Sequence, residues 1–384
     1  MSKKKRRVTI ISRESDEKSI DISMLEEELR IRGIDVSVLC KLFTKEKSLK
    51  ALGYIAHVIR QELEILRSDV VILDTYCIAA SMFPHRKSTK IVQMWHALAA
   101  IKKFGWQNIG AAGGTSERTA RLMKMHHGYD YVLSPSEITA EHFCEAFRVS
   151  EDKIVRLGLP RIDYIKSVTQ GSRQAETAKM LYSRYPELYR HSEKKTILYA
   201  PTFRRGEDVK LQSLIETIDL DRYNLVVKMH PVYGEREKKI LRLAALPQND
   251  KNGIVLAQKD RERGAQCEAA IFYDIEFSSY DWLSVADIII SDYSAFVVEA
   301  ALAEKPLYIY AYDLDEYEKS TGLNMNFGNE EIAKYTFQDA EELAKSLDMD
   351  YDFAALRSFK SKYVDIDTEN CTGALADFIE DLLI

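Results

Sequence analysis

The chain lacks the patterns that mark several common classes of protein. Its five cysteines are scattered and form no Cys-x-x-Cys pair, so neither a disulfide framework nor a zinc site is predicted. No apolar run approaches the ~20 residues that span a bilayer, and the start has no apolar segment typical of a secretory signal. The net charge of −6 favours no nucleic-acid partner. A cytoplasmic protein is therefore expected.

The composition is that of a soluble globular protein. Hydrophobic residues make up 46% of the 384 residues and charged residues 30%, and this length predicts about two domains. Five consecutive basic residues, Lys3 to Arg7, precede the first predicted strand. Two interpretations of this basic start remain open: a solvated tail, or a segment attracted to an anionic membrane.

Short apolar runs alternate with helical segments along the chain, which predicts an α/β fold. The runs are continuously apolar, as is typical of parallel strands covered on both faces. Helices are expected at about 19–32, 137–147 and 374–383. The predicted strands are 8–12, 36–40, 70–73, 91–95, 131–133 and 154–157 in the first half, then 196–200, 225–229, 254–256, 288–290 and 307–310 in the second.

These alternations divide the chain into two Rossmann-like halves. The boundaries expected are 1–165 for an acceptor-side domain, 166–194 for a polar, helix-prone connection, 195–365 for a nucleotide-binding domain and 366–384 for a C-terminal helix. Two such halves with mainly parallel sheets, facing a central cleft, would bind ligands in that cleft.

The most informative segment runs from residue 286 to 313. A strand ends at a polar turn that contains Ser291, Asp292 and Ser294, and a helix follows. Backbone N–H groups at a helix start suit a phosphate group, and Glu299 follows where a carboxylate could reach a ribose. The alternative is that Ser or Asp here only caps the helix.

Two histidines follow predicted strands, one in each half. His96 comes after Ile-Val-Gln-Met-Trp, and His230 comes after Leu-Val-Val-Lys-Met. Histidine is the side chain suited to proton transfer near neutral pH. A lone histidine at a strand end is more often structural, but two in equivalent places favour function. No His-x-His or His-x-x-x-His spacing occurs, so no histidine metal site is predicted.

Three further segments carry charged residues after strands or on a helix. Pro201, Thr202, Arg204 and Arg205 close the first strand of the second half, where guanidinium groups suit a diphosphate; the alternative is a solvated loop. Residues 157–163 read as a turn with a potential ion pair, interpreted as a structural hinge. Residues 113–128 read as a basic amphipathic helix that fits either an anionic membrane or an ordinary surface.

Taken together, these segments resemble the CDP-glycerol glycerophosphotransferase family, whose members build teichoic acid and similar polyol-phosphate polymers. The motifs that carry the resemblance keep a shared order from about residue 90 to 320. They are Gln93-Met94-Trp95-His96, Lys102-Lys103-Phe104-Gly105, Ser134-Pro135-Ser136, Gly158-Leu159-Pro160-Arg161-Ile162-Asp163, Tyr199-Ala200-Pro201-Thr202-Phe203-Arg204, Lys228-Met229-His230-Pro231, Ala286 to Ser294 and Lys305 to Tyr317.

The resemblance implies a GT-B architecture and assigns roles by matching position. His96 would be the general base on the acceptor hydroxyl, and His230 would hold or protonate the diphosphate near the leaving phosphate. Phosphate and nucleotide binding would fall to Arg204, Pro201, Thr202, Ser291, Asp292 and Ser294, with Glu299 on the ribose side.

The implied reaction moves glycerol phosphate or ribitol phosphate from a CDP-activated donor and releases CMP. The implied acceptor is undecaprenyl-linked or polymeric, in teichoic acid or capsule synthesis, and the implied location is the inner face of the cell membrane. No cofactor is expected, and a metal-independent transfer is the simpler prediction because no metal-ligand cluster is evident.

Two departures from the family pattern keep other functions open. Ala97 stands where the family usually has glycine, and Thr321-Gly322 stands where it commonly has Arg-Gly. Arg205 and Arg118 are possible substitutes for that arginine. The alternatives are a GT-B glycosyltransferase that uses a nucleotide sugar, and a non-catalytic binding protein that keeps the fold.

Overall fold

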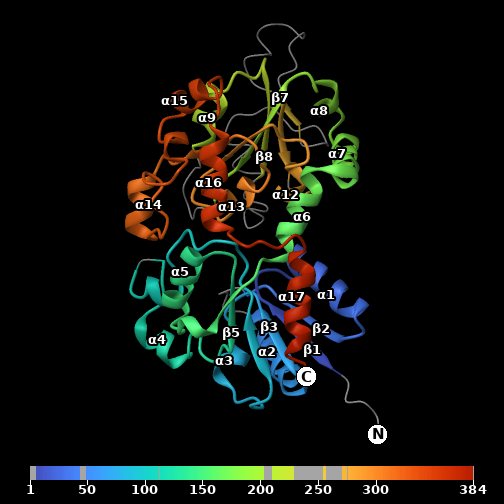
Figure 1. Cartoon of the computed structure of the whole chain (residues 1–384). Coiled ribbons are helices and arrows are strands. Elements are labelled where there is room, and N and C mark those ends of the chain that lie inside the picture. Colours follow the sequence, from blue (N-terminus) through green and yellow to red (C-terminus); the bar gives the residue numbers. More distant parts are fainter. Residues whose placement is uncertain are drawn as a thin grey trace. The chain divides into compact units, whose positions relative to one another are not determined.

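The computed structural model describes residues 6–43, 49–111, 113–202, 210–228, 254–256, 270–274 and 276–383. The chain folds into two compact α/β units (Figure 1). Unit 1 contains Met1–Tyr164, Glu318–Asn324 and Ser361–Ile384, and unit 2 contains Ile165–Tyr317 and Met325–Lys360. The last helix thus belongs to the unit that begins the chain.

Unit 1 is built on a six-stranded sheet in which every strand pairs in parallel. The strand order is β2-β1-β3-β4-β5-β6. The strands are β1 Arg7–Ser12, β2 Asp35–Cys40, β3 Val70–Leu73, β4 Lys90–Gln93, β5 Tyr131–Ser134 and β6 Ile154–Arg156. All carboxyl ends meet at one edge, so side chains just after β1, β3 and β4 are neighbours there.

Unit 2 is built on a seven-stranded sheet of order β13-β12-β11-β7-β8-β10-β9. Every pair is parallel except β9 with β10. The strands are β7 Lys195–Ala200, β8 Tyr223–Lys228, β9 Ile254–Leu256, β10 Ala270–Asp274, β11 Ile288–Ser291, β12 Leu307–Tyr310 and β13 Thr336–Phe337. The predicted α/β class with two mainly parallel sheets is therefore confirmed.

Helices alternate with the strands in both units (Figure 1). They are α1 Ile20–Ile31, α2 Leu49–Arg67, α3 Ile78–Met82, α4 Glu117–Leu122, α5 Glu137–Phe147, α6 Pro160–Thr169, α7 Gly171–Arg184, α8 Pro186–Arg190, α9 Leu211–Thr217, α12 Ser279–Trp282, α13 Phe296–Ala301, α14 Leu314–Ser320, α15 Ala340–Ser346, α16 Phe353–Tyr363 and α17 Cys371–Asp381. Among the described residues, no helix combines the length and the apolar character needed to cross a bilayer.

The sheet cores explain why continuous apolar runs predict the strands well. All four residues of β3 and of β11 are buried, because helices cover both faces of each sheet. Ile72 and Ile289 are fully enclosed examples. Alternating patterns, by contrast, would have indicated one solvated face.

The structure corrects three details of the predicted elements. β4 ends at Gln93 rather than at residue 95, because Trp95 adopts a left-handed backbone with φ of 64° that cannot continue a strand. β10 and the two-residue β13 were not predicted. The expected basic helix over 113–128 is only α4, since Lys124 and His126 have positive φ and lie outside it.

The segment 157–163 is an anchor within unit 1 rather than a local ion pair. Arg161 donates to the buried Asp21 on α1, with Nε 2.7 Å from the carboxylate. Asp163 accepts from the backbone N–H groups of Cys371 and Thr372, at 2.9 and 2.7 Å, and from the Thr372 hydroxyl at 2.6 Å. These contacts tie the segment to α1 and to the start of α17, two helices that pack together (Figure 1).

We predict that Asp163→Ala destabilises the protein by about 2 kcal/mol, because the start of α17 loses a charged acceptor for three donors. Urea unfolding with the linear-extrapolation method measures this change. Asp367→Ala is the matched control, since Asp367 is exposed and lies in the same approach to α17. Equal stability of the two variants would contradict the anchoring role.

Candidate functional site

His96 lies at the carboxyl edge of the unit 1 sheet, three residues after β4 ends. Its side chain is half-buried beside the loop that follows β3. The imidazole Nδ1 lies 3.0 Å from the backbone carbonyl oxygen of Asp74. A carbonyl only accepts hydrogen bonds, so Nδ1 must carry the hydrogen and Nε2 is left as the basic nitrogen of the neutral ring.

Gln93 joins the two loops that hold this imidazole. Its side-chain amide donates to the Thr75 carbonyl at 3.1 Å, and its side-chain oxygen accepts from the Trp95 N–H at 2.9 Å. Gln93 is fully buried, so both bonds are protected from water. The left-handed backbone of Trp95 costs about 1–3 kcal/mol, and the Gln93 bond is one contact that holds it.

An aromatic cluster forms the wall behind His96. The Trp95 ring lies 4.2 Å from the His96 ring and stacks on Phe104 at 4.5 Å between centroids. His126 is buried in the same cluster, where burial and then Arg13 lower its pKa to about 3. His126 is therefore neutral at physiological pH, and it packs within the aromatic cluster rather than transferring protons.

Gly105 lets this wall pack closely against α5. It has φ of 57°, and a Cβ there would lie 2.3 Å from the carbonyl oxygen of Ala146. Only glycine fits both demands. The Lys102-Lys103-Phe104-Gly105 motif thus positions Phe104 through backbone geometry.

Asp74 is the most unusual group at this edge. Asp74 is 2% exposed, and its Oδ1 has no hydrogen-bond partner among the residues that the structure describes. Burial raises its pKa to about 6, although hydrogen bonding by Ser12 and the charge of His96 act in the opposite direction and Glu14 adds to the rise. Asp74 belongs to the loop whose backbone carbonyl holds the His96 ring. Its ionised carboxylate can stabilise an imidazolium formed there.

In unit 2, the predicted phosphate-binding residues come together at the ends of β7 and β11. The Asp292 carboxylate accepts from the Thr202 N–H at 2.9 Å and from its hydroxyl at 2.6 Å. The Ser291 hydroxyl donates to the Ala200 carbonyl at 2.8 Å. Pro201 follows Ala200 and is also buried. These buried contacts join the two turns into one platform.

Ser294 and Glu299 lie in and after the turn that follows β11. Ser294 is half-buried, and its hydroxyl accepts from the Phe296 N–H at 3.3 Å. Glu299 is buried on α13 and accepts from the Tyr280 hydroxyl at 2.7 Å. Of the four acidic or hydroxylic residues predicted on this turn and helix, Ser294 therefore offers the most accessible side chain.

Arg204 and His230 lie outside the described residues. The structure does describe the residue two positions before His230, which is Lys228 at the end of β8. Its Nζ lies 3.1 Å from the Asp274 carboxylate in a buried ion pair. Burial alone would raise the pKa of Asp274, but Lys228 and the hydrogen bonds from Trp282 and Tyr185 outweigh burial and lower it.

The sequence indicated His96 but not the groups that orient it. Asp74 follows the predicted strand 70–73 and Gln93 lies inside the predicted strand 91–95, and each looks locally like an ordinary polar residue. Their importance depends on β3 and β4 being neighbours in the sheet, with Leu73 opposite Gln93. The same holds for Asp274, whose strand β10 was not predicted.

Comparisons with known proteins identify a matching family and similar proteins. A family model described as CDP-Glycerol:Poly(glycerophosphate) glycerophosphotransferase matches residues 1–381. The teichoic acid ribitol-phosphate primase of Bacillus spizizenii is 26% identical, over 98% of this chain and 91% of that protein. The teichoic acid glycerol-phosphate primase of Bacillus subtilis is 28% identical, over 85% of this chain and 77% of that protein.

A solved structure shares the fold over almost the whole chain. The structure of the wall teichoic acid polymerase TagF aligns with a TM-score of 0.65 at 18% identity. The alignment covers 99% of this chain and 89% of that chain. At this identity the likeness concerns the fold alone.

We predict that Asp74→Asn stabilises the protein at pH 8 by up to about 3 kcal/mol. The folded-state pKa of Asp74, about 6, lies above the usual value of 3.8, so wild-type stability falls as pH rises through 6. The uncharged variant avoids this loss, and its advantage should vanish towards pH 4. Urea unfolding at several pH values measures the difference.

Asp69→Asn is the matched control for that experiment. Asp69 precedes the same strand at its opposite end, where it accepts from the Arg7 N–H at 3.2 Å and pairs with Arg86 at 3.7 Å. We expect this variant to lose stability rather than gain it. An Asp74→Asn protein that is no more stable than wild type at pH 8 would contradict the assigned burial cost.

Proposed function

The chain belongs to the CDP-glycerol:poly(glycerophosphate) glycerophosphotransferase family, and we propose that it transfers glycerol phosphate or ribitol phosphate from a CDP-activated donor to an acceptor hydroxyl. The family match over residues 1–381 confirms the resemblance that the motifs carried between about residues 90 and 320. The names of the two primases support a place in teichoic acid synthesis.

The observation that carries the catalytic proposal is the fixed ring of His96. With Nδ1 committed to the Asp74 carbonyl, Nε2 is the nitrogen able to take a proton from the acceptor hydroxyl. The adjacent Asp74 carboxylate stabilises the imidazolium that results. Asp74 is therefore a positioning residue that acts through the His96 base, and it needs no contact with the substrate.

The proposed step is a displacement at the β-phosphorus of the CDP-polyol. The acceptor oxygen forms a bond to that phosphorus while His96 removes its proton, and the bond from the phosphorus to the bridging oxygen breaks. CMP leaves with the electron pair of that bond. Positioned donors around the phosphate oxygens stabilise the developing charge, and each donor contributes roughly 10²–10³ in rate.

We assign the donor diphosphate to unit 2. Ser294 and the turn after β11 would bind it, on the platform made by Asp292, Ser291, Thr202 and Pro201. Arg204 would bind phosphate oxygens, and His230 would hold or protonate the diphosphate near the leaving phosphate. Glu299 would lie on the ribose side. The Lys228–Asp274 ion pair supports this assignment because it fixes the strand end that leads to His230.

The acceptor and the place of action are also part of the proposal. An undecaprenyl-linked or polymeric polyol-phosphate acceptor, reached at the inner face of the cell membrane, fits the family and the basic start from Lys3 to Arg7. Both named relatives are primases, and the chain covers 91% and 77% of them. We therefore propose addition of a first polyol-phosphate unit.

The test is nucleotide release from the purified protein with CDP-glycerol, CDP-ribitol and several nucleotide sugars, with membrane lipid extract as acceptor. We expect CMP from one CDP-polyol, with and without EDTA. His96→Ala should lower kcat by at least ~10² while CDP binding persists, because the variant loses the base but not the donor site. His230→Ala should also lose turnover.

His127→Ala serves as the control, since His127 is an exposed histidine in the same unit. It should retain full activity. Release of a nucleoside diphosphate from a nucleotide sugar would replace the proposal with a glycosyltransferase. Full activity of His96→Ala would remove the assigned base.

A further inference from the structure

A short segment of unit 1 is enclosed in the sequence by unit 2. Glu318–Asn324 belongs to unit 1, whereas Ile165–Tyr317 before it and Met325–Lys360 after it belong to unit 2. We call this segment the strap. The chain enters unit 1 and returns to unit 2 within these seven residues, so the strap is a covalent link between the unit that holds His96 and the unit assigned to the donor.

The strap pairs with the loop that leads to Phe104. Leu323 forms an antiparallel bridge with Lys102. Beside this bridge the backbone N–H groups of Lys103 and Asn324 donate to carbonyl oxygens on the opposite segment, at 3.0 and 2.8 Å, one in each direction. These bonds fix the backbone of the loop immediately before Phe104.

A reciprocal pair of side-chain amides adds to this pairing. The Asn324 amide donates to the Gln107 side-chain oxygen at 3.1 Å, and the Gln107 amide donates back to the Asn324 side-chain oxygen at 3.1 Å. Asn324 also donates to the Lys102 carbonyl at 3.3 Å, and Gln107 donates to the Glu145 carboxylate on α5 at 2.9 Å. Each amide thus uses its oxygen and both of its hydrogens, so the two side chains fit only in this arrangement.

The loop held by the strap supports the wall behind the base. Phe104 stacks on Trp95 at 4.5 Å between ring centroids, and the Trp95 ring lies 4.2 Å from the His96 ring. Packed side chains leave little free space, so a small shift of one ring displaces its neighbour. The position of Phe104 therefore affects the position of the His96 ring through Trp95.

Both ends of the strap are packed on one residue of the donor turn. Tyr317, directly before the strap, stacks on Tyr293 with 4.4 Å between ring centroids. Phe327, which follows the strap, meets Tyr293 edge-on at 5.8 Å. Tyr293 is fully buried, and it lies between Asp292 and Ser294 in the turn after β11. A shift of this turn is therefore passed to both ends of the strap.

We propose that the strap couples donor binding at the turn after β11 to the position of the His96 base. Closure of the turn on a diphosphate displaces the enclosed Tyr293, and the strap carries this displacement to Phe104. The base then reaches its reactive position when the phosphorus to be attacked is present. Asn324 and Gln107 are positioning residues that act through the aromatic wall. This role rests on the proposed function, because it requires the donor at that turn.

The experiment follows Trp95 while CDP binds, and it needs neither acceptor nor turnover. The chain has three tryptophans, so labelling with 5-fluorotryptophan gives separate ¹⁹F signals, and Trp95→Phe identifies the signal of Trp95. We expect CDP to shift this signal in the wild type. Asn324→Ala should still bind CDP, measured by calorimetry, but should lose most of the shift because the strap no longer holds the loop.

Turnover gives a second measurement of the same variant. With the CDP-polyol and acceptor that support CMP release, Asn324→Ala should lower kcat about ten-fold to a hundred-fold, the cost of a catalytic group misplaced by up to about 1 Å. Gln107→Ala should act similarly. The double variant should lower kcat no further than the larger single effect, because two residues that share one interaction are not additive.

Tyr317→Leu tests the other end of the path. It removes the ring that stacks on Tyr293 and leaves the amide pair unchanged. This variant should also bind CDP without the shift of the Trp95 signal. If Asn324→Ala does not fold, Gln107→Ala and Tyr317→Leu decide the question in the same assay.

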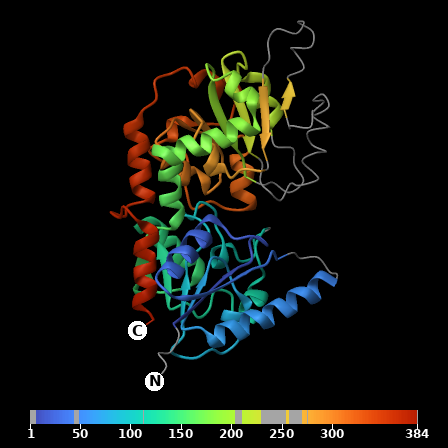
Figure 2. The same ribbon diagram turned by 90° about the vertical axis from the view of Figure 1, so that its right-hand side faces the viewer.

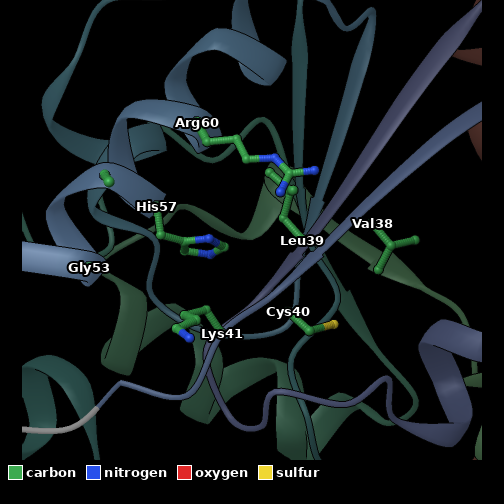
Figure 3. A pocket seen from close by; sticks show the side chains of 8 residues that line it. Val38, Leu39, Cys40, Lys41, Gly53, His57 and Arg60 are labelled. Carbon is green, nitrogen blue, oxygen red and sulfur yellow. The ribbon is translucent and has the colours of Figure 1, made fainter. Parts of the chain in front are cut away.

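Two substitutions outside the path serve as controls. Asn329→Ala removes an exposed asparagine that follows the strap in unit 2. Arg60→Gln changes an exposed residue of α2, a long helix on the outside of unit 1 (Figure 2), at the hollow between α2 and the end of β2 (Figure 3). Both variants should keep the CDP-induced shift of the Trp95 signal, and Asn329→Ala should keep the wild-type kcat.

Three results would overturn the coupling while the donor assignment stands. The first is CDP binding to the wild type with no shift of the Trp95 signal. The second is an Asn324→Ala protein that keeps both the shift and the wild-type kcat. The third is an equal loss of the shift in Asn324→Ala and Arg60→Gln, which would mean a general loosening of unit 1. Absence of CDP binding in the wild type would instead remove the donor assignment, and the coupling with it.

Discussion

The hydrogen bond from His96 Nδ1 to the Asp74 carbonyl is the contact on which the catalytic edge of the unit 1 sheet depends. It decides which nitrogen of the ring is basic, and it joins the loops after β3 and β4. The Gln93 side chain also joins these two loops, because it donates to the Thr75 carbonyl and accepts from the Trp95 N–H. Neither bond would exist if β3 and β4 were not neighbours in a parallel sheet.

Two features at the same edge of the sheet lower the free energy of unfolding. Trp95 holds a left-handed backbone that an aromatic residue rarely adopts, and Asp74 keeps a buried carboxyl group whose Oδ1 finds no hydrogen-bond partner in the described part of the chain. Each feature costs free energy in folding, and both lie beside His96. Strained and desolvated groups persist where the surrounding structure enforces them, which is typical of functional sites.

The sequence predicted the strands of this fold better than the contacts of the site. Continuous apolar runs located β3, β9 and β12 with the observed bounds. In β3 and β12 every residue is buried, and burial on both faces is a local pattern that a sequence can reveal. β10 was not predicted, although Ala270–Asp274 begins with an apolar run of the same kind. His96 could be found because it follows a strand, whereas Asp74 and Gln93 gain meaning only from strand order.

The most direct test of His96 as the base is the tautomer of its neutral ring, read from ¹⁵N chemical shifts of labelled imidazole. We expect hydrogen on Nδ1 and a bare, basic Nε2 in the wild type. Hydrogen on Nε2 would mean that the Asp74 carbonyl does not hold the ring, and it would contradict the assignment of His96 as the base that faces the acceptor.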